Sequence, residues 1–370
     1  MIRLSKSNIG EEEIEAVTKV LKNEYLGMGQ DVKEFEEILT KYFDRPTICV
    51  NTGTSALQLA LQAIGLTVGD EVLIQSLTYV ASYQAISATG AIPVSCEVIP
   101  ETMTIDIEDA KKKITSKTKA IMPVHYGGGV GNLDDVYKFA KLNNLRVIED
   151  AAHAFGSQYK NQLVGSFGDI CCFSFDGIKN ITSGEGGAIV SNDENVINKI
   201  KDYRLLGVEK DTDKRYAGER SWEFDVTEQG WRYHMSNIMA AIGKEQFKKI
   251  SLFKEKRQRF AKLYQDHLNN VEGIVCLNHN YSDIVPHIFM VRILNSKREV
   301  VKEFLNSQGV QTGMHYFPNH YLSKYKSNDI ELKLTDIIYK EMLTLPLHTG
   351  LLDDDVINIC SLIKKVLKEL

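Results

Sequence analysis

A lysine and two carboxylates are the residues of this sequence with the clearest capacity for chemistry. Lys179 lies in the stretch FSFDGIKNITSGEGG, between an aromatic, apolar segment and a glycine-rich loop. Glu149 and Asp150 end the apolar run LRVIED, where an ionised carboxylate without a partner would be costly. We expect Asp150 to have a cationic partner, and His153, three residues on, to face the same cavity. The simpler interpretations are a solvated lysine and an aspartate that begins a helix.

Hydroxyl and aromatic residues follow three other apolar runs. Thr54 and Ser55 come after TICV and open a helical pattern, so free N–H groups and hydroxyls there can bind an anion such as a phosphate. An ordinary helix cap is the alternative, because Ser and Thr are favoured at that position. Tyr79 follows DEVLIQ, where its ring can stack on a planar ligand or serve in packing. Ser174 lies near the end of DICCFSF.

Strands of a parallel sheet are the elements that must position these side chains. Between residues 47 and 175, short apolar runs alternate with helical patterns, which is typical of an α/β protein with crossover helices. Ligands of such sheets bind beyond the carboxyl ends of the strands, so we expect the lysine, the acid, the aromatic ring and the hydroxyls at one edge. Pyridoxal 5′-phosphate (PLP) needs this set: a lysine for its aldehyde, an acid for its pyridine nitrogen and a cradle for its phosphate.

The pattern changes toward the C-terminus. Residues 234–268 have the periodicity of one long helix, and the apolar runs and helical patterns beyond it indicate a smaller α+β unit. We therefore predict a large domain at 1–240 and a small C-terminal domain at 241–370, joined by the long helix. Two N-terminal helices are expected at 11–22 and 31–43.

Composition and charge exclude several classes of protein. Of the 370 residues 43% are hydrophobic and 25% charged, and the net charge of -5 comes without a basic run, which argues against a nucleic-acid partner. We expect a cytoplasmic protein without a secretory signal or a membrane span. The six cysteines have no CxxC spacing and indicate buried, reduced thiols. No metal site is expected, since Pro318 separates His315 from His320 in the nearest candidate pair.

The sequence resembles the nucleotide-sugar aminotransferases of the DegT/StrS type, which have the fold type I architecture of aspartate aminotransferase. The motifs that carry the resemblance span nearly the whole chain and include NTGTSALQLALQAIGLTVGDEVLIQS, VIEDAAHAFGS, VGSFGDICCFSF, KNITSGEGGAIVSND and MSNIMAAIG. The resemblance implies PLP as the cofactor, a large domain with a mostly parallel sheet flanked by helices, and a homodimer whose active site is shared between subunits.

The resemblance also implies a role for each site residue. Lys179 matches the lysine that binds the PLP aldehyde, and Asp150 matches the acid that pairs with the pyridine nitrogen. Relatives with histidine in place of this lysine are dehydratases, so Lys179 favours transamination. The remaining matches are His153 near the ring hydroxyl, Tyr79 on the face of the ring, and the phosphate contacts Thr54, Ser55 and Ser174.

Two stretches depart from the family pattern. After VHYGG a glutamine is usual, whereas this chain has another glycine. Arg232 and His234 stand where asparagine and arginine are usual. In the family, the first of these positions reaches across the dimer to the partner's PLP phosphate, and a guanidinium can bind a phosphate through two charge-assisted hydrogen bonds. The alternative is that Arg232 turns away and pairs with a surface acid such as Glu228.

The implied reaction is transfer of an amino group from L-glutamate to a nucleotide-linked keto-6-deoxyhexose, giving an amino sugar for surface polysaccharide such as the O-antigen of lipopolysaccharide. A 4-keto sugar and dTDP are favoured, as in a dTDP-4-amino-4,6-dideoxyglucose-forming enzyme. Residues around HYFPNH, His315 and Tyr316 among them, are expected to contact the substrate. A 3-keto substrate and a non-catalytic regulatory protein of the same fold are the alternatives.

Overall fold

Seven strands form the central sheet of the computed structural model, which describes residues 1–369. Their order is β1-β9-β8-β5-β4-β2-β3. β9 runs antiparallel to both of its neighbours, and the other pairs are parallel. The expected mostly parallel sheet is therefore confirmed. The strands are β1 (Thr47–Val50), β2 (Glu71–Gln75), β3 (Ile92–Cys96), β4 (Thr118–Met122), β5 (Arg146–Asp150), β8 (Ile170–Ser174) and β9 (Gly187–Ser191).

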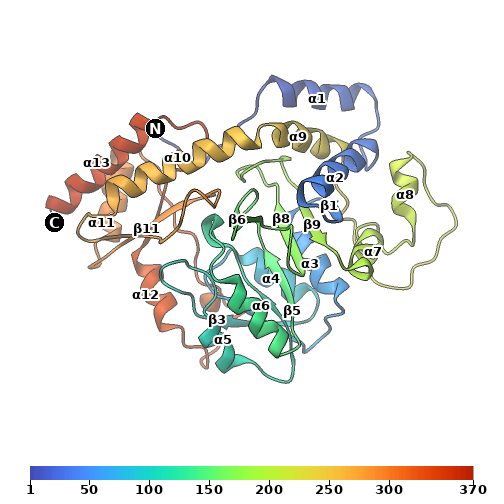
Figure 1. Cartoon of the computed structure of the whole chain (residues 1–370), viewed down its shortest axis with the longest axis horizontal. Helices are drawn as coiled ribbons and strands as arrows, with labels where there is room; N and C mark the ends of the chain where they lie inside the picture. The colour runs from blue at the N-terminus through green and yellow to red at the C-terminus, as the bar shows by residue number, and fades with distance from the viewer. Residues whose placement is uncertain (370) are drawn as a thin grey trace.

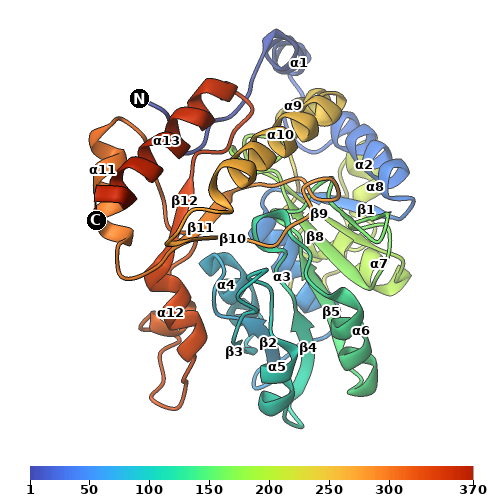
Figure 2. The same cartoon turned by 60° about the vertical axis from the view of Figure 1, so that its left-hand side comes forward.

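Helices cover both faces of this sheet (Figures 1 and 2). One hydrophobic core includes side chains of α2, α6 and α9 (Asn237–Lys248), and the core on the opposite face includes side chains of α3, α4 and α7. Because both faces are covered, every residue of β1, β8 and β9 is buried. The helices are α1 (Glu11–Lys22), α2 (Gln30–Phe43), α3 (Gly53–Ala63), α4 (Val80–Ala88), α5 (Ile107–Lys113), α6 (Leu133–Leu142), α7 (Glu194–Tyr203) and α8 (Asp211–Tyr216).

A second unit follows along the chain and has a core of its own. Its sheet is antiparallel, in the order β10-β11-β12, and Figure 2 shows the helices beside it. The N-terminus joins this unit, since Ile2 forms a β-bridge with Val310. The domain boundary at residues 240 and 241 stays a prediction. The elements are β10 (Ile274–Cys276), β11 (Phe289–Ile293), β12 (Met342–Leu345), α10 (Ile250–Leu268), α11 (Arg298–Ser307), α12 (Lys333–Glu341) and α13 (Asp353–Glu369).

The expectation of one long helix over 234–268 is wrong. The segment forms α9 (Asn237–Lys248) and α10, which are separated at Lys249. The Lys249 N–H bonds to the Gln246 carbonyl, three residues back, and the Lys249 ammonium lies 2.7 Å from a carboxylate oxygen of Glu13 in α1. α9 packs on α1 and α2, whereas α10 packs on α13. Each helix thus follows a different surface, which local periodicity does not reveal.

The two predicted N-terminal helices are confirmed as α1 and α2. No helix within residues 1–369 combines the length and the apolarity needed to cross a membrane. The short elements are η1 (Tyr126–Gly128), β6 (Gln158–Tyr159), β7 (Gln162–Leu163) and η2 (Asn319–Tyr321).

Candidate active site

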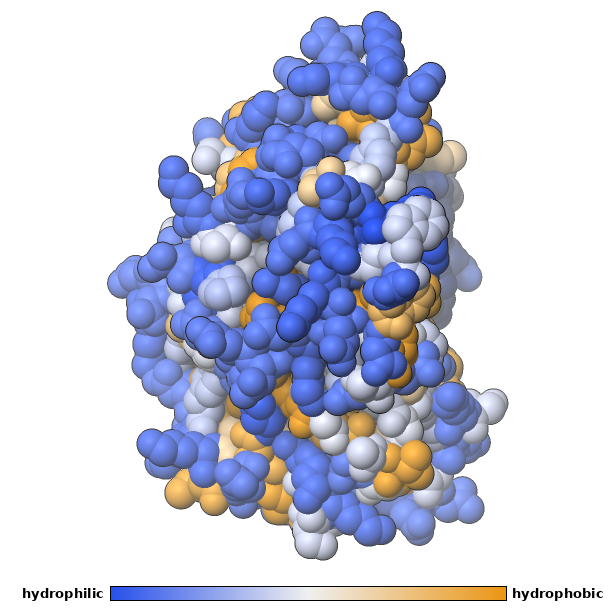
Figure 3. Space-filling view, turned by 90° about the vertical axis from the view of Figure 1, so that its right-hand side faces the viewer, coloured by the Kyte–Doolittle hydropathy of each residue, from blue (hydrophilic) through white to orange (hydrophobic). Residues whose placement is uncertain are grey.

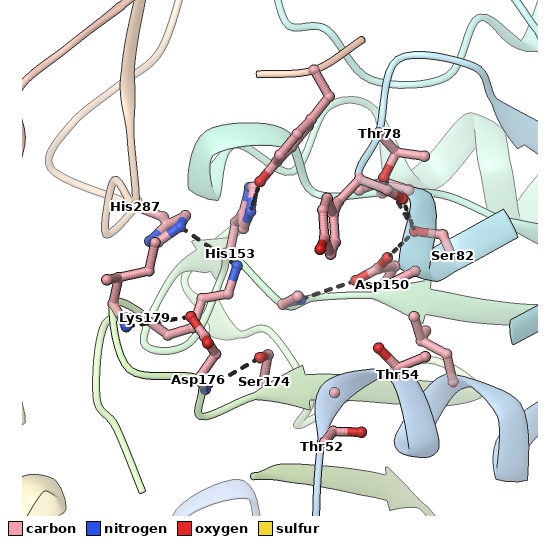
Figure 4. A pocket seen from close by; sticks show the side chains of 18 of the residues that line it. Thr52, Thr54, Thr78, Ser82, Asp150, His153, Ser174, Asp176, Lys179 and His287 are labelled. Carbon is pink, nitrogen blue, oxygen red and sulfur yellow. Dashed lines mark hydrogen bonds between the residues drawn. The ribbon is translucent and has the colours of Figure 1, made fainter. Parts of the chain in front are cut away.

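A cavity of about 490 Å³ lies where β5 and β8 end and α3 and α4 begin. Segments of the second unit close its other side with His287, His315 and Tyr316. Figure 4 shows the side chains that converge on it. Two predicted site residues, Ser55 and Arg232, are not part of the lining. The predicted site residues that do line the cavity are Thr54, Tyr79, Asp150, His153, Ser174, Lys179, His315 and Tyr316.

Asp150, the last residue of β5, is buried and held by neutral donors. Ser82, on the first turn of α4, donates its hydroxyl to Oδ2 at 2.6 Å, and the N–H of Ala152 donates to Oδ1 at 3.2 Å. Within residues 1–369, no lysine, arginine or histidine forms an ion pair with this carboxylate. Its charge is therefore available to a cation bound in the cavity.

Lys179 is half-buried on the other side of the cavity (Figure 4). Its Nζ lies 3.5 Å from Nε2 of His287. Burial lowers the pKa of Lys179 to about 8, and the charges of Asp176 and Asp150 act against that shift. With this pKa about a tenth of the amine is neutral at pH 7, and the neutral form can act as a nucleophile or a base.

His153 presents an N–H donor to the same space. Its Nδ1 lies 3.2 Å from the N–H of Gly127 and accepts from it. Burial, followed by the charge of Lys179, lowers the pKa of His153 well below its usual range, so the ring is neutral. The proton must then be on Nε2, which donates to the hydroxyl oxygen of Tyr316 at 2.9 Å.

The start of α3 forms a cradle for an anion. Thr52 caps the helix by accepting from the Ser55 N–H at 3.0 Å, and the Ser55 hydroxyl is engaged with Asn51 and Thr52. The N–H groups of Gly53 and Thr54 bond to no acceptor within residues 1–369, and both residues face the cavity. A Cβ on Gly53 would lie 2.7 Å from the Cβ of Ser174, so glycine allows β8 and α3 to meet there.

This donor set fits PLP. The cavity has the volume of a small-molecule site, and it joins a helix N-terminus for a phosphate, a carboxylate for a protonated nitrogen and a lysine for an aldehyde. The contact roles of individual residues, the role of Ser55 included, stay predictions. No group of three or more metal-ligating side chains occurs in the part of the chain that the structure describes.

Lining residues that were not predicted from the sequence include Ser82, Asp176, Glu185 and His287. Ser82 follows Tyr79 by three residues in a helical pattern, which places the two on neighbouring positions of one face, so a signal was present. Asp176 and Glu185 flank Lys179 in the same loop. His287 comes from the segment before β11, and nothing local in the sequence connects that segment to the cavity.

The two departures from the family pattern have different structural settings. A Cβ on Gly129 would lie 2.2 Å from the ring of His279, so the imidazole fills the space that a side chain would take. Arg232 is exposed and has no ion pair within residues 1–369, and Glu228 instead accepts from the Tyr203 hydroxyl. The surface pair with Glu228 is therefore not formed, and the contact across a dimer stays a prediction.

Comparison with known proteins gives a consistent result over the whole chain. Residues 7–364 match the DegT/DnrJ/EryC1/StrS aminotransferase family. The chain is 36% identical to the GDP-perosamine synthase of Escherichia coli O157:H7, with 85% of this chain and 84% of that protein covered. It is 32% identical to the spore coat polysaccharide biosynthesis protein SpsC of Bacillus subtilis, with 97% and 95% covered.

A solved structure extends this similarity to the cofactor. The putative sugar aminotransferase Spr1654 of Streptococcus pneumoniae, in its PMP form, superposes with a TM-score of 0.92 at 29% identity, covering all of both chains. A PLP form of the same protein has a TM-score of 0.90. PLP is the cofactor of this chain, in agreement with the donor set of the cavity. By sequence and by structure, the chain belongs to the DegT/DnrJ/EryC1/StrS family of PLP-dependent sugar aminotransferases.

Proposed function

We propose that this protein transfers the amino group of L-glutamate to a nucleotide-linked 4-keto-6-deoxyhexose. The observation that carries the proposal is that Lys179 and Asp150 line the same cavity. The pKa of Lys179 is about 8, and no cationic side chain within residues 1–369 forms an ion pair with Asp150. When bound, PLP supplies the carbonyl group that takes and returns the amino group, and the ring that accepts the electron pair.

Lys179 transfers the protons of the reaction. Its neutral amine takes a proton from Cα of the amino donor and, in the second half of the reaction, delivers one to C4 of the sugar. Asp150 holds the proton on the pyridine nitrogen, since a nearby carboxylate favours the charged form of that nitrogen. Ser82 fixes the carboxylate through its hydrogen bond of 2.6 Å.

Binding and orientation fall to the other lining residues. The free N–H groups of Gly53 and Thr54, with the hydroxyl of Ser174, bind the phosphate dianion at the N-terminus of α3. The neutral ring of His153 holds one N–H proton, on Nε2, and the ring hydroxyl of the cofactor would replace the Tyr316 hydroxyl as its acceptor. Tyr79 covers the ring face and excludes water from it.

The substrate class is supported by the second unit and by the relatives. His315 is oriented by a contact of 3.0 Å from Nδ1 to the Thr344 hydroxyl. Burial, followed by the charge of Lys179, lowers the pKa of His315 to about 4, so a neutral imidazole and the Tyr316 hydroxyl offer hydrogen bonds to sugar hydroxyls. The name of one relative specifies a GDP-sugar product, which sets GDP beside dTDP as the nucleotide.

A substrate panel tests this function. The purified holoenzyme, proposed to be a cytoplasmic homodimer, is incubated with L-glutamate and with 4-keto and 3-keto hexoses linked to dTDP, GDP or UDP, and products are identified by mass and NMR. We expect 2-oxoglutarate and a 4-amino sugar from a 4-keto substrate. Product from 3-keto sugars alone reassigns the carbon. A holoenzyme that aminates no keto sugar in the panel contradicts the proposal and favours a regulatory protein of the same fold.

A further inference from the structure

Asn319 and His320, two buried residues of the second unit, form hydrogen bonds to a turn of the large-sheet unit. The turn Ser76–Thr78 follows β2, and η2 lies against it. The Asn319 side-chain amide donates to the carbonyls of Ser76 at 3.0 Å and Thr78 at 2.8 Å, and the Asn319 backbone N–H donates to Ser76 at 3.0 Å. Neither Asn319 nor His320 lines the cavity, so the PLP chemistry makes no direct use of them.

His320 completes this junction with all of its ring hydrogen bonds made. Nε2 lies 3.0 Å from a carboxylate oxygen of Asp336, which only accepts, so Nε2 carries the proton. Nδ1 then accepts from the Ser76 hydroxyl at 2.7 Å, and the Ser76 oxygen accepts from the His320 backbone N–H at 3.1 Å. The neutral ring therefore leaves no proton or lone pair without a partner, and it is 5% exposed.

Hydrogen bonds continue from the turn to the acid of the cavity (Figure 4). The hydroxyl of Thr78 lies 3.1 Å from that of Ser82, and Ser82 donates to Asp150 at 2.6 Å. Tyr79 lies between these two residues in sequence. Its ring centroid is 5.6 Å from that of Tyr316, which precedes Asn319 by three residues. The junction thus positions the rings of Tyr79 and Tyr316, and also Ser82, which donates to Asp150.

We propose that Asn319 and His320 are positioning residues, which hold the turn in the place where Ser82 orients Asp150 and Tyr79 faces Tyr316. The inference rests on PLP as the cofactor and on the proposed role of Asp150, but not on the identity of the sugar. A purely structural role, in which the two residues only join the units, is the competing explanation. It predicts a loss of stability with an unchanged cofactor site.

The chain offers a control for that explanation. Glu97, which follows β3, accepts from the N–H groups of Leu334 at 3.0 Å and Thr335 at 2.8 Å. It therefore anchors the start of α12, and its carboxylate forms no hydrogen bond to the turn Ser76–Thr78. Figures 1 and 2 both show α12 near β3. Glu97→Ala should weaken the junction of the units and leave the turn in place.

The test compares Asn319→Ala, His320→Gln, Ser76→Ala and Glu97→Ala as holoenzymes. The readouts are the Kd for PLP, the visible circular dichroism of the bound cofactor, kcat and KM, and Tm. We expect the Asn319 and His320 variants to weaken PLP binding on the order of tenfold, as lost support of a binding group does, and to change the dichroic band. We expect kcat to fall more than KM rises, because misplacement of a reacting group acts on the transition state. Glu97→Ala should lower Tm and leave the dichroic band and Kd as in the wild type.

Equal Tm losses in all four variants with unchanged Kd and dichroism would overturn the proposal. If Asn319→Ala does not fold, Ser76→Ala and His320→Gln still decide the question. Because the two side chains bond to each other, the double mutant should lose less affinity for PLP than the sum of the two single losses. A wild type that binds PLP and aminates no sugar contradicts the proposed function and leaves this inference standing, since Kd and dichroism need only the cofactor.

Discussion

Lys179 gives the clearest prediction at the scale of single residues. Lys179→Ala removes the amine and should abolish multiple-turnover transamination, as well as the PLP that borohydride traps on the peptide containing residue 179. Mass spectrometry of the reduced protein and a glutamate-dependent assay measure the two effects. Lys138→Ala, at an exposed position of α6, is the matched control and should behave as the wild type. Sustained turnover by Lys179→Ala would falsify the assignment.

The lowered pKa of Lys179 also predicts a pH dependence of stability. In the cofactor-free protein the pKa is about 8, below the usual value of about 10.4 in an unfolded chain. Between these values the unfolded state binds more protons, so the Lys179 contribution to stability rises with pH. Lys179→Met should therefore gain most in Tm below pH 8, and the gain should shrink as pH approaches 10. A Tm difference that is constant from pH 6 to 10 contradicts the lowered pKa.

Asp150→Asn tests the partner of the pyridine nitrogen. The amide keeps the shape and the hydrogen bond from Ser82 but removes the charge. We expect kcat to fall by roughly 10²–10³-fold, as for other electrostatic partners in a dry site. The absorbance of bound PLP reports whether the variant still holds the cofactor. Normal turnover by a PLP-loaded Asn variant means that another group holds the pyridine proton.

Residues at the ends of buried strands were predictable, and residues brought by distant segments were not. Asp150 could be placed in the site because a carboxylate after an apolar strand needs a partner. The Ser55 hydroxyl shows the opposite case, because the cap and the anion cradle have the same sequence signal and this hydroxyl is engaged in the cap. His287 reaches the cavity only through the packing of the second unit, which the sequence does not encode locally.

At the scale of elements, the N-terminus of α3 is the feature to test. Thr52→Ala removes the cap on the Ser55 N–H and should cost about 1 kcal/mol of stability, while PLP binds more weakly because the free N–H groups are less well oriented. Thr52→Ser keeps a capping hydroxyl and should retain PLP affinity. Chemical denaturation and PLP titration measure the two effects.

A helix cap far from the cavity provides a control that separates the loss of stability from the loss of PLP affinity. Asp106 caps α5 by accepting from the Glu108 N–H at 2.8 Å. Asp106→Ala should lose a similar amount of stability with an unchanged Kd for PLP. If Thr52→Ala also keeps its Kd, the start of α3 does not bind the phosphate.

Elements whose packing environment is uniform along their length were predicted well from the sequence. Six strands of the large sheet, β1 to β5 and β8, lie in apolar runs because helices cover both faces of the sheet, so their positions follow from those runs. The seventh, β9, lies outside the predicted alternation over residues 47–175. The division between α9 and α10 was missed because apolar residues recur at helical spacing on both sides of Lys249. What changes there is the packing partner, from α1 and α2 to α13, and a change of partner leaves no periodic signal.

At the scale of the whole molecule, the segment between α8 and α9 projects from the body (Figure 1). It exposes Trp222 at 86% and Phe224 at 59%. The face toward α8 is otherwise largely hydrophilic, with hydrophobic side chains in separate patches (Figure 3). Arg232 lies in this segment, and the carbonyl of the next residue, Tyr233, accepts from the Asn51 N–H at 2.7 Å, directly before the cap of α3.

The last prediction concerns Arg232, which we expect to bind the PLP phosphate of the partner in a homodimer. A positive charge beside a dianion is favourable, and a guanidinium can form two charge-assisted hydrogen bonds with it. Arg232→Ala should then weaken PLP retention and reduce the rise in Tm that PLP produces. Arg220→Ala, in the same exposed segment, is the control and should keep both. A PLP-bound dimer in which the guanidinium lies beyond direct or water-bridged reach of the partner's phosphate contradicts this role, and so does an Arg232→Ala dimer that retains PLP as the wild type does.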